Sequence, residues 1–526
     1  MKRLLLILLL TANAWAGFRD PDRPLDERVE DLLRQLTLEE KAGQMDEICQ
    51  PIERLGIPGY SWWSECIHGV GRAGKATVFP VAIGLAATWD TGLVGRVATV
   101  ISDEARAKHQ GSRTERYHGL TYWAPAVDLA RDPRWGRIEE TFGEDPHLVS
   151  QMGLTMVRSL QGDDPRYLKV AATPKHFAVH SQETDRHWKS FDVSERWLHE
   201  YYLAPFRTCF VAGNAASVMT AYSGFNGMPC TMHRWLLTEL LRGEWKFDGA
   251  VVTDWGAPRH LQKSFKMVGT DEDAVAAALR AGVDVLCQHD SCDFPNMYPT
   301  ILNAVKLGIV KETEIDAAVR RSLRVRFRLG MFDPPERVPY EKLTPDILAS
   351  PTNAAVALQA SREAIVLLKN ARVPGRGNPT PILPLDLRHL ESIAVLGSHA
   401  DRVYLGNYSG TPALPAVTTY AGITNRVGNQ LIVRTVPWIE IDRNKKKPET
   451  GDEQRRSVAA AVKAARDSDV AVVVLGLNPK IEMEGRDRDR LDLPKDQQEF
   501  VEKIFAANPA TVVVLINGMI LVKQRD

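Results

Sequence analysis

The strongest constraint on the fold is a regular alternation of two kinds of segment over residues 25–330. Short apolar runs of strand length alternate with longer stretches whose apolar residues recur at helical spacing. Strands and helices that alternate in this way form parallel sheets covered by helices, and about 300 residues of such units fit a (β/α)8-type barrel. The strand-like runs are Thr121–Asp128, Val170–Phe177, Ser217–Tyr222, Gly249–Asp254 and Val283–Leu286.

The helical stretches carry their own start and stop signals. Over residues 145–162, Asp145 can cap the helix, Pro146 suits its first position and Gly162 can end it. Residues 194–213 and 271–282 repeat this arrangement. In a barrel of this kind, catalytic residues lie where the strands end. Polar residues occupy such positions in this sequence, namely Lys175-His176, Tyr222 and Asp254-Trp255.

The second half of the chain has a different pattern. Residues 17–332 form the predicted barrel domain, and the Pro- and charge-rich stretch 333–351 is the predicted linker. Over residues 352–526, runs rich in Val, Leu and Ile alternate with helices and predict a doubly wound α/β sandwich domain. No covering helix follows the last apolar run, so we expect this α/β domain to be incomplete at its C-terminus. The strand-like runs are Ser392–Gly397, Asp469–Leu477 and Ala510–Gly518, and the helical stretches are 452–467 and 495–507.

Charge and the N-terminus limit the partners and the location. Lys plus Arg and Asp plus Glu both number 66, so the chain has no excess positive charge for nucleic acid. Lys2 and Arg3 precede the apolar run Leu4–Leu10, and small residues follow at 14–16, which is typical of a secretory signal peptide over residues 1–16. No later run is long enough to cross a membrane. We therefore expect a secreted or periplasmic protein without a nucleic-acid or membrane partner, and the oligomeric state stays open.

Two carboxylate neighbourhoods are candidates for catalysis. Asp254 ends a buried strand and precedes Trp255, although an acid there could also simply cap the next helix. By itself, the charged stretch Lys480–Pro494 is typical of a solvated surface loop. Several tryptophans adjoin polar residues, and as a group they would suit a carbohydrate, whose C–H faces pack on flat rings, although each alone is typical of a core. These are Trp62, Trp63, Trp123, Trp135 and Trp255.

Metal and phosphate chemistry have weaker support in the sequence. Cys287, His289 and Cys292 could bind zinc, but a fourth ligand with standard spacing is missing. The glycine-rich stretch Gly69–Lys75 is followed by Ala76 where a phosphate-binding loop needs Ser or Thr. We expect neither a metal nor a cofactor.

Six ordered motifs resemble family 3 of the glycoside hydrolases, in its bacterial exo-acting β-xylosidase and β-glucosidase branch. The similarity runs from about Leu25 to Gly518 and includes an acidic loop over residues 482–494. The family resemblance implies a barrel joined to an α/β sandwich, with the active site in the crevice between them. The other motifs are Tyr60–Gly71 (YSWWSECIHGVG), Pro125–Asp145 (PAVDLARDPRWGRIEETFGED), Lys175–His180 (KHFAVH), Phe247–Gly256 (FDGAVVTDWG) and Tyr404–Gly410 (YLGNYSG).

The resemblance also implies roles for individual residues. It makes Asp254 the nucleophile and Glu482 the general acid/base, with Glu484 as the second candidate. Glu65 stands where many members have Asp, and the Trp-Trp-x-Glu pattern resembles the xylosidase-leaning branch, while Ser223 replaces the usual Asn. The terminal sugar at the non-reducing end would be surrounded by Glu65, Arg137, Lys175, His176, Met219, Tyr222 and Trp255.

The expected function is that of a retaining exo-β-glycosidase acting on xylosides or glucosides by double displacement. Asp254 must be ionised to attack the anomeric carbon, whereas Glu482 must first donate a proton and then act as a base. In a retaining enzyme these two carboxyls lie about 5–5.5 Å apart. The alternatives are a catalytically impaired sugar-binding relative and a zinc-dependent hydrolase.

Overall fold

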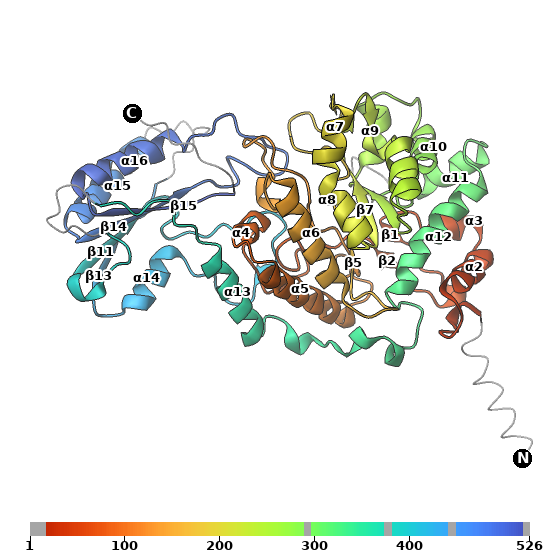
Figure 1. Ribbon diagram of the computed structural model, residues 1–526, viewed down its shortest axis with the longest axis horizontal. Helices are drawn as coiled ribbons and strands as arrows, with labels where there is room; N and C mark the ends of the chain where they lie inside the picture. The colour runs from red at the N-terminus through yellow and green to blue at the C-terminus, as the bar shows by residue number, and fades with distance from the viewer. Residues whose placement is uncertain (1–16, 289–295, 373–380, 440–448, 519–526) are drawn as a thin grey trace, which may run out of the picture. The chain divides into compact units, whose positions relative to one another are not determined.

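A computed structural model describes residues 17–288, 296–372, 381–439 and 449–518 (Figure 1). These residues form two compact units. The first unit reaches to Asp132 and also contains Ile138–Ala364 and Asn407–Ala413. The second unit contains Pro133–Arg137, Ile365–Gly406 and the chain from Leu414 onward. Each unit has its own buried core.

A ring of short paired segments forms the centre of the first unit, which confirms the predicted barrel-type fold. Strands β4 (Thr121–Tyr122) and β5 (Ala171–Ala172) are parallel, as are β7 (Ser217–Thr220) and β10 (Ala250–Thr253). All residues of these strands are buried. Parallel bridges complete the ring and join Ser64 to Tyr122, Ala126 to Lys175, Phe177 to Thr220, Val252 to Val285, and Asp46 to Leu286.

The ring differs from eight parallel strands at its first hairpin. Strands β1 (Ile48–Cys49) and β2 (Tyr60–Ser61) pair antiparallel. Only residues 50–59 connect them, which is shorter than the dozen or more residues that a parallel crossover needs. In the part of the chain that the structure describes, the ring therefore has seven paired segments: 46–49, 60–64, 121–126, 171–177, 217–220, 250–253 and 285–286.

Helices cover the outside of this ring and follow the predicted caps. Helix α6 (Pro146–Gln161) begins where the Asp145 side chain accepts a hydrogen bond from the Leu148 N–H at 2.7 Å, and it ends at Gly162 with φ of 75°. It packs alongside α5 (Thr91–Gly111) (Figure 1). Helix α10 (Asp271–Ala281) ends at Gly282 as predicted, but its cap is Thr270, whose side chain accepts a hydrogen bond from the Asp273 N–H, rather than Asp271. Within the described ranges, no helix is both long and apolar enough to cross a membrane.

The predicted helix over residues 194–213 is less regular than its apolar pattern suggests. It begins at the Ser194 cap, but α7 (Glu195–Trp197) and α8 (Ala204–Arg207) alternate with wider turns over 198–202 and 208–212. Pro205 lies in this stretch and has no N–H to donate to the preceding turn. An apolar period detects the helical face but does not detect such changes in turn width.

The boundary between the units lies farther along the chain than the predicted linker at 333–351. That stretch packs on the first unit, where the buried Asp333 carboxylate pairs with Arg28 and accepts a hydrogen bond from the Tyr167 hydroxyl. Tyr340 is also buried and contacts Tyr167. Helix α13 (Pro351–Glu363) follows and belongs to the same unit, so the division comes after Ala364.

The second unit is a parallel sheet with helices on both faces, as predicted for a doubly wound domain. The strand order is β13-β11-β14-β15, and each neighbouring pair is parallel. One core joins the sheet to α15 and α16, and a second core covers the opposite face. The strands are β11 (Ser392–Leu396), β13 (Ile432–Thr435), β14 (Val470–Gly476) and β15 (Thr511–Ile516), and the helices are α14 (Thr419–Val427), α15 (Glu449–Arg466) and α16 (Lys495–Ala507).

One segment from the second half of the chain returns to the first unit. Strand β12 (Thr411–Pro412) pairs in parallel with β3 (Lys75–Ala76). The backbone of Tyr408 approaches Gly71 so closely that a β-carbon there would lie 2.3 Å from the Tyr408 carbonyl oxygen. The glycine-rich stretch Gly69–Lys75 therefore packs directly against this segment.

Candidate active site

Asp254 lies directly after strand β10, at the end of the ring that the sequence predicts for catalysis. Its Oδ1 accepts a hydrogen bond from the Trp255 N–H at 2.7 Å, and its side chain is 11% exposed. The next helix, α9 (Ala257–Lys263), has Gly256 as its N-cap and no side-chain cap. Asp254 is therefore not the cap of that helix, and its second oxygen, Oδ2, faces His176.

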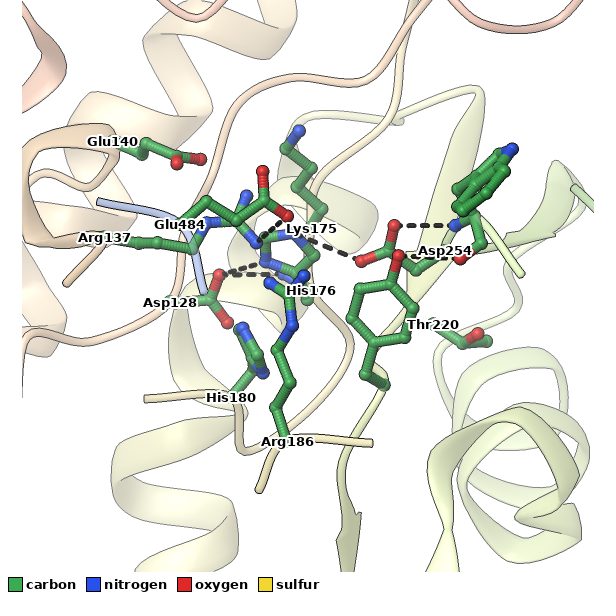
Figure 2. Close-up of polar contacts among 12 residues, drawn as sticks. Asp128, Arg137, Glu140, Lys175, His176, His180, Arg186, Thr220, Asp254 and Glu484 are labelled. Carbon is green, nitrogen blue, oxygen red and sulfur yellow. Dashed lines mark hydrogen bonds and ion pairs between the residues drawn. The ribbon is translucent and has the colours of Figure 1, made fainter. Parts of the chain in front are cut away.

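His176 bridges two carboxylates that come from different parts of the ring (Figure 2). Its Nε2 lies 3.6 Å from Asp254 Oδ2, and its Nδ1 lies 2.8 Å from Asp128 Oδ2. The backbone N–H of His176 donates to the same Asp128 oxygen at 2.9 Å. All three residues are at least nine-tenths buried. The paired segments 121–126, 171–177 and 250–253 thus bring these side chains together.

Glu65 and Lys175 form a second buried pair in the first unit. Lys175 Nζ lies 3.4 Å from Glu65 Oε2, and the Trp63 indole N–H donates to Glu65 Oε1 at 2.7 Å. Burial raises the pKa of Glu65, and the nearby Lys175 opposes this effect only partly. Lys175 Nζ also lies 4.8 Å from the centre of the Tyr408 ring, a cation–π contact that the segment Asn407–Ala413 contributes.

Tyr222 contacts Trp255, the residue that follows Asp254 in the chain. The Tyr222 hydroxyl donates to the Trp255 carbonyl oxygen at 2.7 Å, and the Arg186 guanidinium lies 4.6 Å from the centre of the Tyr222 ring. Met219 lies on β7 with its side chain buried, and its carbonyl accepts a hydrogen bond from the Phe177 N–H. The first unit therefore holds seven of the predicted site residues: Glu65, Lys175, His176, Met219, Tyr222, Asp254 and Trp255.

Arg137, Glu482 and Glu484 belong to the second unit. Arg137 Nη1 lies 3.5 Å from Glu484 Oε1 (Figure 2), whereas Glu482 Oε2 lies 3.9 Å from Arg488 Nη1. The loop that carries the two acids is attached to the segment Pro133–Arg137, because the Arg488 N–H donates to the Arg134 carbonyl oxygen at 2.8 Å. The predicted residues are thus divided between the two units.

The other sequence candidates have different outcomes. Trp62 and Trp123 of the first unit and Trp135 of the second unit are buried, whereas Trp63 and Trp255 are partly exposed. Trp63 stacks on Trp123, with ring centres 5.0 Å apart and an interplanar angle of 12°.

The zinc candidates are described only in part. Cys287 is fully buried, and burial raises the pKa of its thiol well above the usual range. His289 and Cys292 lie outside the described residues. Among the residues with described positions, no cluster of three or more His, Cys, Asp or Glu side chains could hold a metal ion.

The sequence analysis did not identify two residues of the site, Asp128 and Tyr408. Asp128 ends the predicted strand Thr121–Asp128, just as Asp254 ends its own strand, so its position was a usable signal. Tyr408 lies within the YLGNYSG motif, but nothing local indicates that it contacts a lysine 233 positions earlier. The first residue could have been found from strand ends, whereas the second depends on a long-range contact.

Comparisons with known proteins agree with this architecture. Residues 32–325 match the family described as "Glycosyl hydrolase family 3 N terminal domain", and residues 365–526 match "Glycosyl hydrolase family 3 C-terminal domain". A solved structure titled as the GH3 exo-β-xylosidase XlnD in complex with a xylobiose aziridine probe superposes with a TM-score of 0.85. It is 26% identical and covers 96% of this chain and 64% of its own.

Curated relatives show the same similarity in sequence. "Beta-D-xylosidase 1" of Arabidopsis thaliana is 35% identical over 94% of this chain and 62% of its own length. "Xylan 1,4-beta-xylosidase" of Xylanibacter ruminicola is 38% identical over 75% of this chain and 46% of its own length. The chain spans less than two thirds of the length of these relatives. Both matched regions, their order and the shared fold show that this chain belongs to glycosyl hydrolase family 3.

Proposed function

We propose that the chain is a retaining exo-β-glycosidase that releases a terminal xylose or glucose from the non-reducing end of β-linked oligosaccharides. The observation that carries this proposal is the position of Asp254 at a strand end, with His176 beside it and the Glu65–Lys175 pair in the same unit. A glycosidase needs a carboxylate for the anomeric carbon and charged groups for the sugar hydroxyls. Family membership adds support, because the named relatives are xylosidases and glucosidases.

In this mechanism Asp254 attacks the anomeric carbon while Glu482 donates a proton to the glycosidic oxygen. The bond between the anomeric carbon and that oxygen breaks, and the sugar becomes an ester of Asp254. Glu482, now ionised, takes a proton from water as the water oxygen attacks the same carbon. The ester bond then breaks and returns the Asp254 carboxylate. Two inversions give net retention of the anomeric configuration.

We assign the acid/base role to Glu482 rather than Glu484 because of their different partners. Glu484 lies 3.5 Å from Arg137, and an adjacent guanidinium stabilises the ionised carboxylate. A general acid must instead carry a proton when the substrate binds. Glu482 has a more distant cation, Arg488, at 3.9 Å, and its side chain is 10% exposed.

Azide rescue tests these assignments through the stereochemistry of the product. In Asp254→Ala, azide takes the place of the missing carboxylate and attacks once, so the expected product is the α-glycosyl azide. In Glu482→Ala, azide intercepts the ester formed on Asp254, so the expected product is the β-glycosyl azide. NMR of the products from a nitrophenyl β-xyloside distinguishes the two. Glu484→Ala serves as the matched control and should turn over without azide.

Other outcomes would contradict the proposal in separable ways. If azide rescues Glu484→Ala and not Glu482→Ala, then the acid/base assignment is wrong while the reaction class stands. If the unmodified chain hydrolyses none of the nitrophenyl β-xyloside, β-glucoside and α-L-arabinofuranoside, then the proposed activity itself fails. We expect the highest kcat/KM on the β-xyloside, because curated relatives that match more than nine-tenths of this chain carry β-xylosidase in their names.

We also propose that residues 1–16 are a signal peptide and that the enzyme works outside the cytoplasm. The support is the basic start, the apolar run Leu4–Leu10 and the small residues near position 16. N-terminal sequencing of the protein recovered from outside the cytoplasm should begin near Gly17. Recovery of the unprocessed chain only from the cytoplasm would contradict this proposal.

A further inference from the structure

Asp128 makes two hydrogen bonds to a single residue of the candidate site. Its Oδ2 accepts from the His176 backbone N–H at 2.9 Å and from the ring Nδ1 at 2.8 Å. The Asp128 and His176 side chains are only 1% and 2% exposed. The first bond fixes the backbone at the strand end, and the second fixes the rotation of the ring about that backbone. Two bonds to one acceptor therefore orient the imidazole (Figure 2).

This contact also decides which ring nitrogen carries a proton. An ionised carboxylate can only accept, so Nδ1 must be the donor to Asp128. The opposite nitrogen, Nε2, then faces Asp254 Oδ2 at 3.6 Å. If Nε2 had no proton, its lone pair would face a carboxylate. A proton on Nε2 instead makes the ring a cation between two carboxylates, which is the arrangement that opposite charges favour.

Other ionisable groups near His176 are themselves paired. The His180 ring centre lies 4.8 Å from that of His176, and His180 Nε2 lies 3.3 Å from Glu183. Glu183 also binds Arg186 at 2.7 Å. Lys175, which precedes His176 in the chain, points to Glu65. Asp128 and Asp254 face the two imidazole nitrogens of His176 from opposite sides.

We propose that Asp128 is a positioning residue that holds His176 as an imidazolium against the Asp254 carboxylate. This inference rests on the proposed function, in which Asp254 is the nucleophile. The imidazolium stabilises the Asp254 carboxylate before attack, and again when the ester breaks and the electron pair of the bond to the sugar returns to Asp254. Asp128 does not touch the reacting atoms and acts through His176.

The Asp128→Asn variant removes the negative charge of this side chain while nearly keeping its shape. The amide is nearly the same size, and its oxygen can still accept the backbone N–H. It carries no negative charge to hold the ring as a cation. We expect a lower pKa of His176, because the imidazolium loses its Nε2 proton more easily beside a neutral amide. The kcat should fall about 10–100-fold, the range found when a partner that orients a metal-binding histidine is removed, with a smaller change in KM.

Two measurements distinguish this positioning role from a general loss of structure. Imidazole-15N NMR, with the His176 signals assigned through His176→Gln, should show both ring nitrogens protonated in the unmodified chain and loss of one of these protons at lower pH in the variant. The basic limb of the kcat/KM profile on nitrophenyl β-xyloside, to which the proton of Glu482 also contributes, should move to lower pH in Asp128→Asn, because His176 loses its proton more easily. Asp128→Glu keeps the charge and should retain the basic limb. Asp163→Asn, at an exposed loop position, is the control.

The outcomes distinguish this proposal from the proposed function. An unchanged pKa of His176 together with an unchanged basic limb in Asp128→Asn would overturn the positioning role. If Asp128→Asn fails to fold, a loss of the Nδ1–H signal and of the basic limb in folded Asp128→Glu would also overturn it. If the unmodified chain hydrolyses no glycoside, the proposed function fails, yet the NMR comparison still decides whether Asp128 sets the proton on His176.

Discussion

Asp46 is a single residue at which burial outweighs every other influence on a carboxyl group. It lies at the closure of the ring, is 3% exposed, and accepts hydrogen bonds from the Glu47 and Met297 backbone N–H groups at 2.7 and 2.8 Å. Burial raises the pKa of Asp46 to about 7, although these N–H groups oppose the shift. The folded chain therefore binds a proton there at a pH where the unfolded chain has released it.

The expected result is a loss of stability as pH rises. A raised carboxyl pKa favours folding fully below the unfolded value of about 4, and this contribution disappears as pH rises through about 7. A shift of three pKa units corresponds to roughly 4 kcal/mol. Asp46→Asn removes the titration, so urea unfolding between pH 4 and pH 8 should show the unmodified chain losing stability relative to this variant. Parallel curves would contradict this, and Asp192→Asn, an exposed position, is the control.

At the scale of elements, contacts with other parts of the first unit fix the position of the segment Asn407–Ala413. The Asn407 N–H donates to Glu139 at 2.8 Å, and the Asn407 carbonyl oxygen lies 2.9 Å from His68 Nε2. Strand β12 then pairs with β3. These contacts place the Tyr408 ring against Lys175, so a site residue depends on the position of a whole segment.

Gly71→Ala should displace this segment. A β-carbon at Gly71 would lie 2.3 Å from the Tyr408 carbonyl oxygen, and a backbone atom cannot move away as a flexible side chain can. We expect destabilisation of about 1–3 kcal/mol, as for other overpacked sites, and a raised KM. Gly84→Ala in α4 (Ala82–Ala86) is the matched control, because its nearest neighbour is 3.4 Å away. Equal urea midpoints for the two variants would show that the Tyr408 backbone does not pack against Gly71.

At the scale of the molecule, the chain is divided into two units at a place that composition does not reveal. The stretch 333–351 is rich in Pro and charge, which is typical of linkers, yet it packs on the first unit. The Asp333 side chain is 1% exposed and pairs with Arg28 of α2 (Leu25–Gln35). This buried ion pair holds the start of the 333–351 stretch on the first unit, which continues to Ala364.

Asp333→Ala should destabilise the first unit strongly. Removal of one partner of a buried pair leaves an uncompensated charge, here the Arg28 guanidinium, and typically costs about 3–5 kcal/mol. Urea unfolding followed by tryptophan fluorescence should show a clearly lower midpoint. Glu200→Gln breaks an exposed pair with Arg196 and should leave the midpoint unchanged. A change of less than 1 kcal/mol in Asp333→Ala, about the most that an exposed pair contributes, would mean that 333–351 behaves as a linker.

Much of the fold could be predicted from local signals, and the exceptions have physical causes. The Asp145 cap, Pro146 and Gly162 bound α6 as expected, because these effects act within one helical turn. The antiparallel pair β1–β2 was not anticipated, since it depends on the length of one connection. Strand β13 was also missed, because it is only four residues long and none of its residues is fully buried.

The sequence by itself determined the alternation of strands and helices, the residue types at the strand ends and the motifs that show the family. These depend on periodicity and on groups a few positions apart. Only the tertiary structure decided that Asp128 binds a histidine 48 positions away, or that Asn407–Ala413 returns to contact Lys175. The reason is physical: closing a ring brings strand ends together in space, and no local interaction records which distant side chains will meet there.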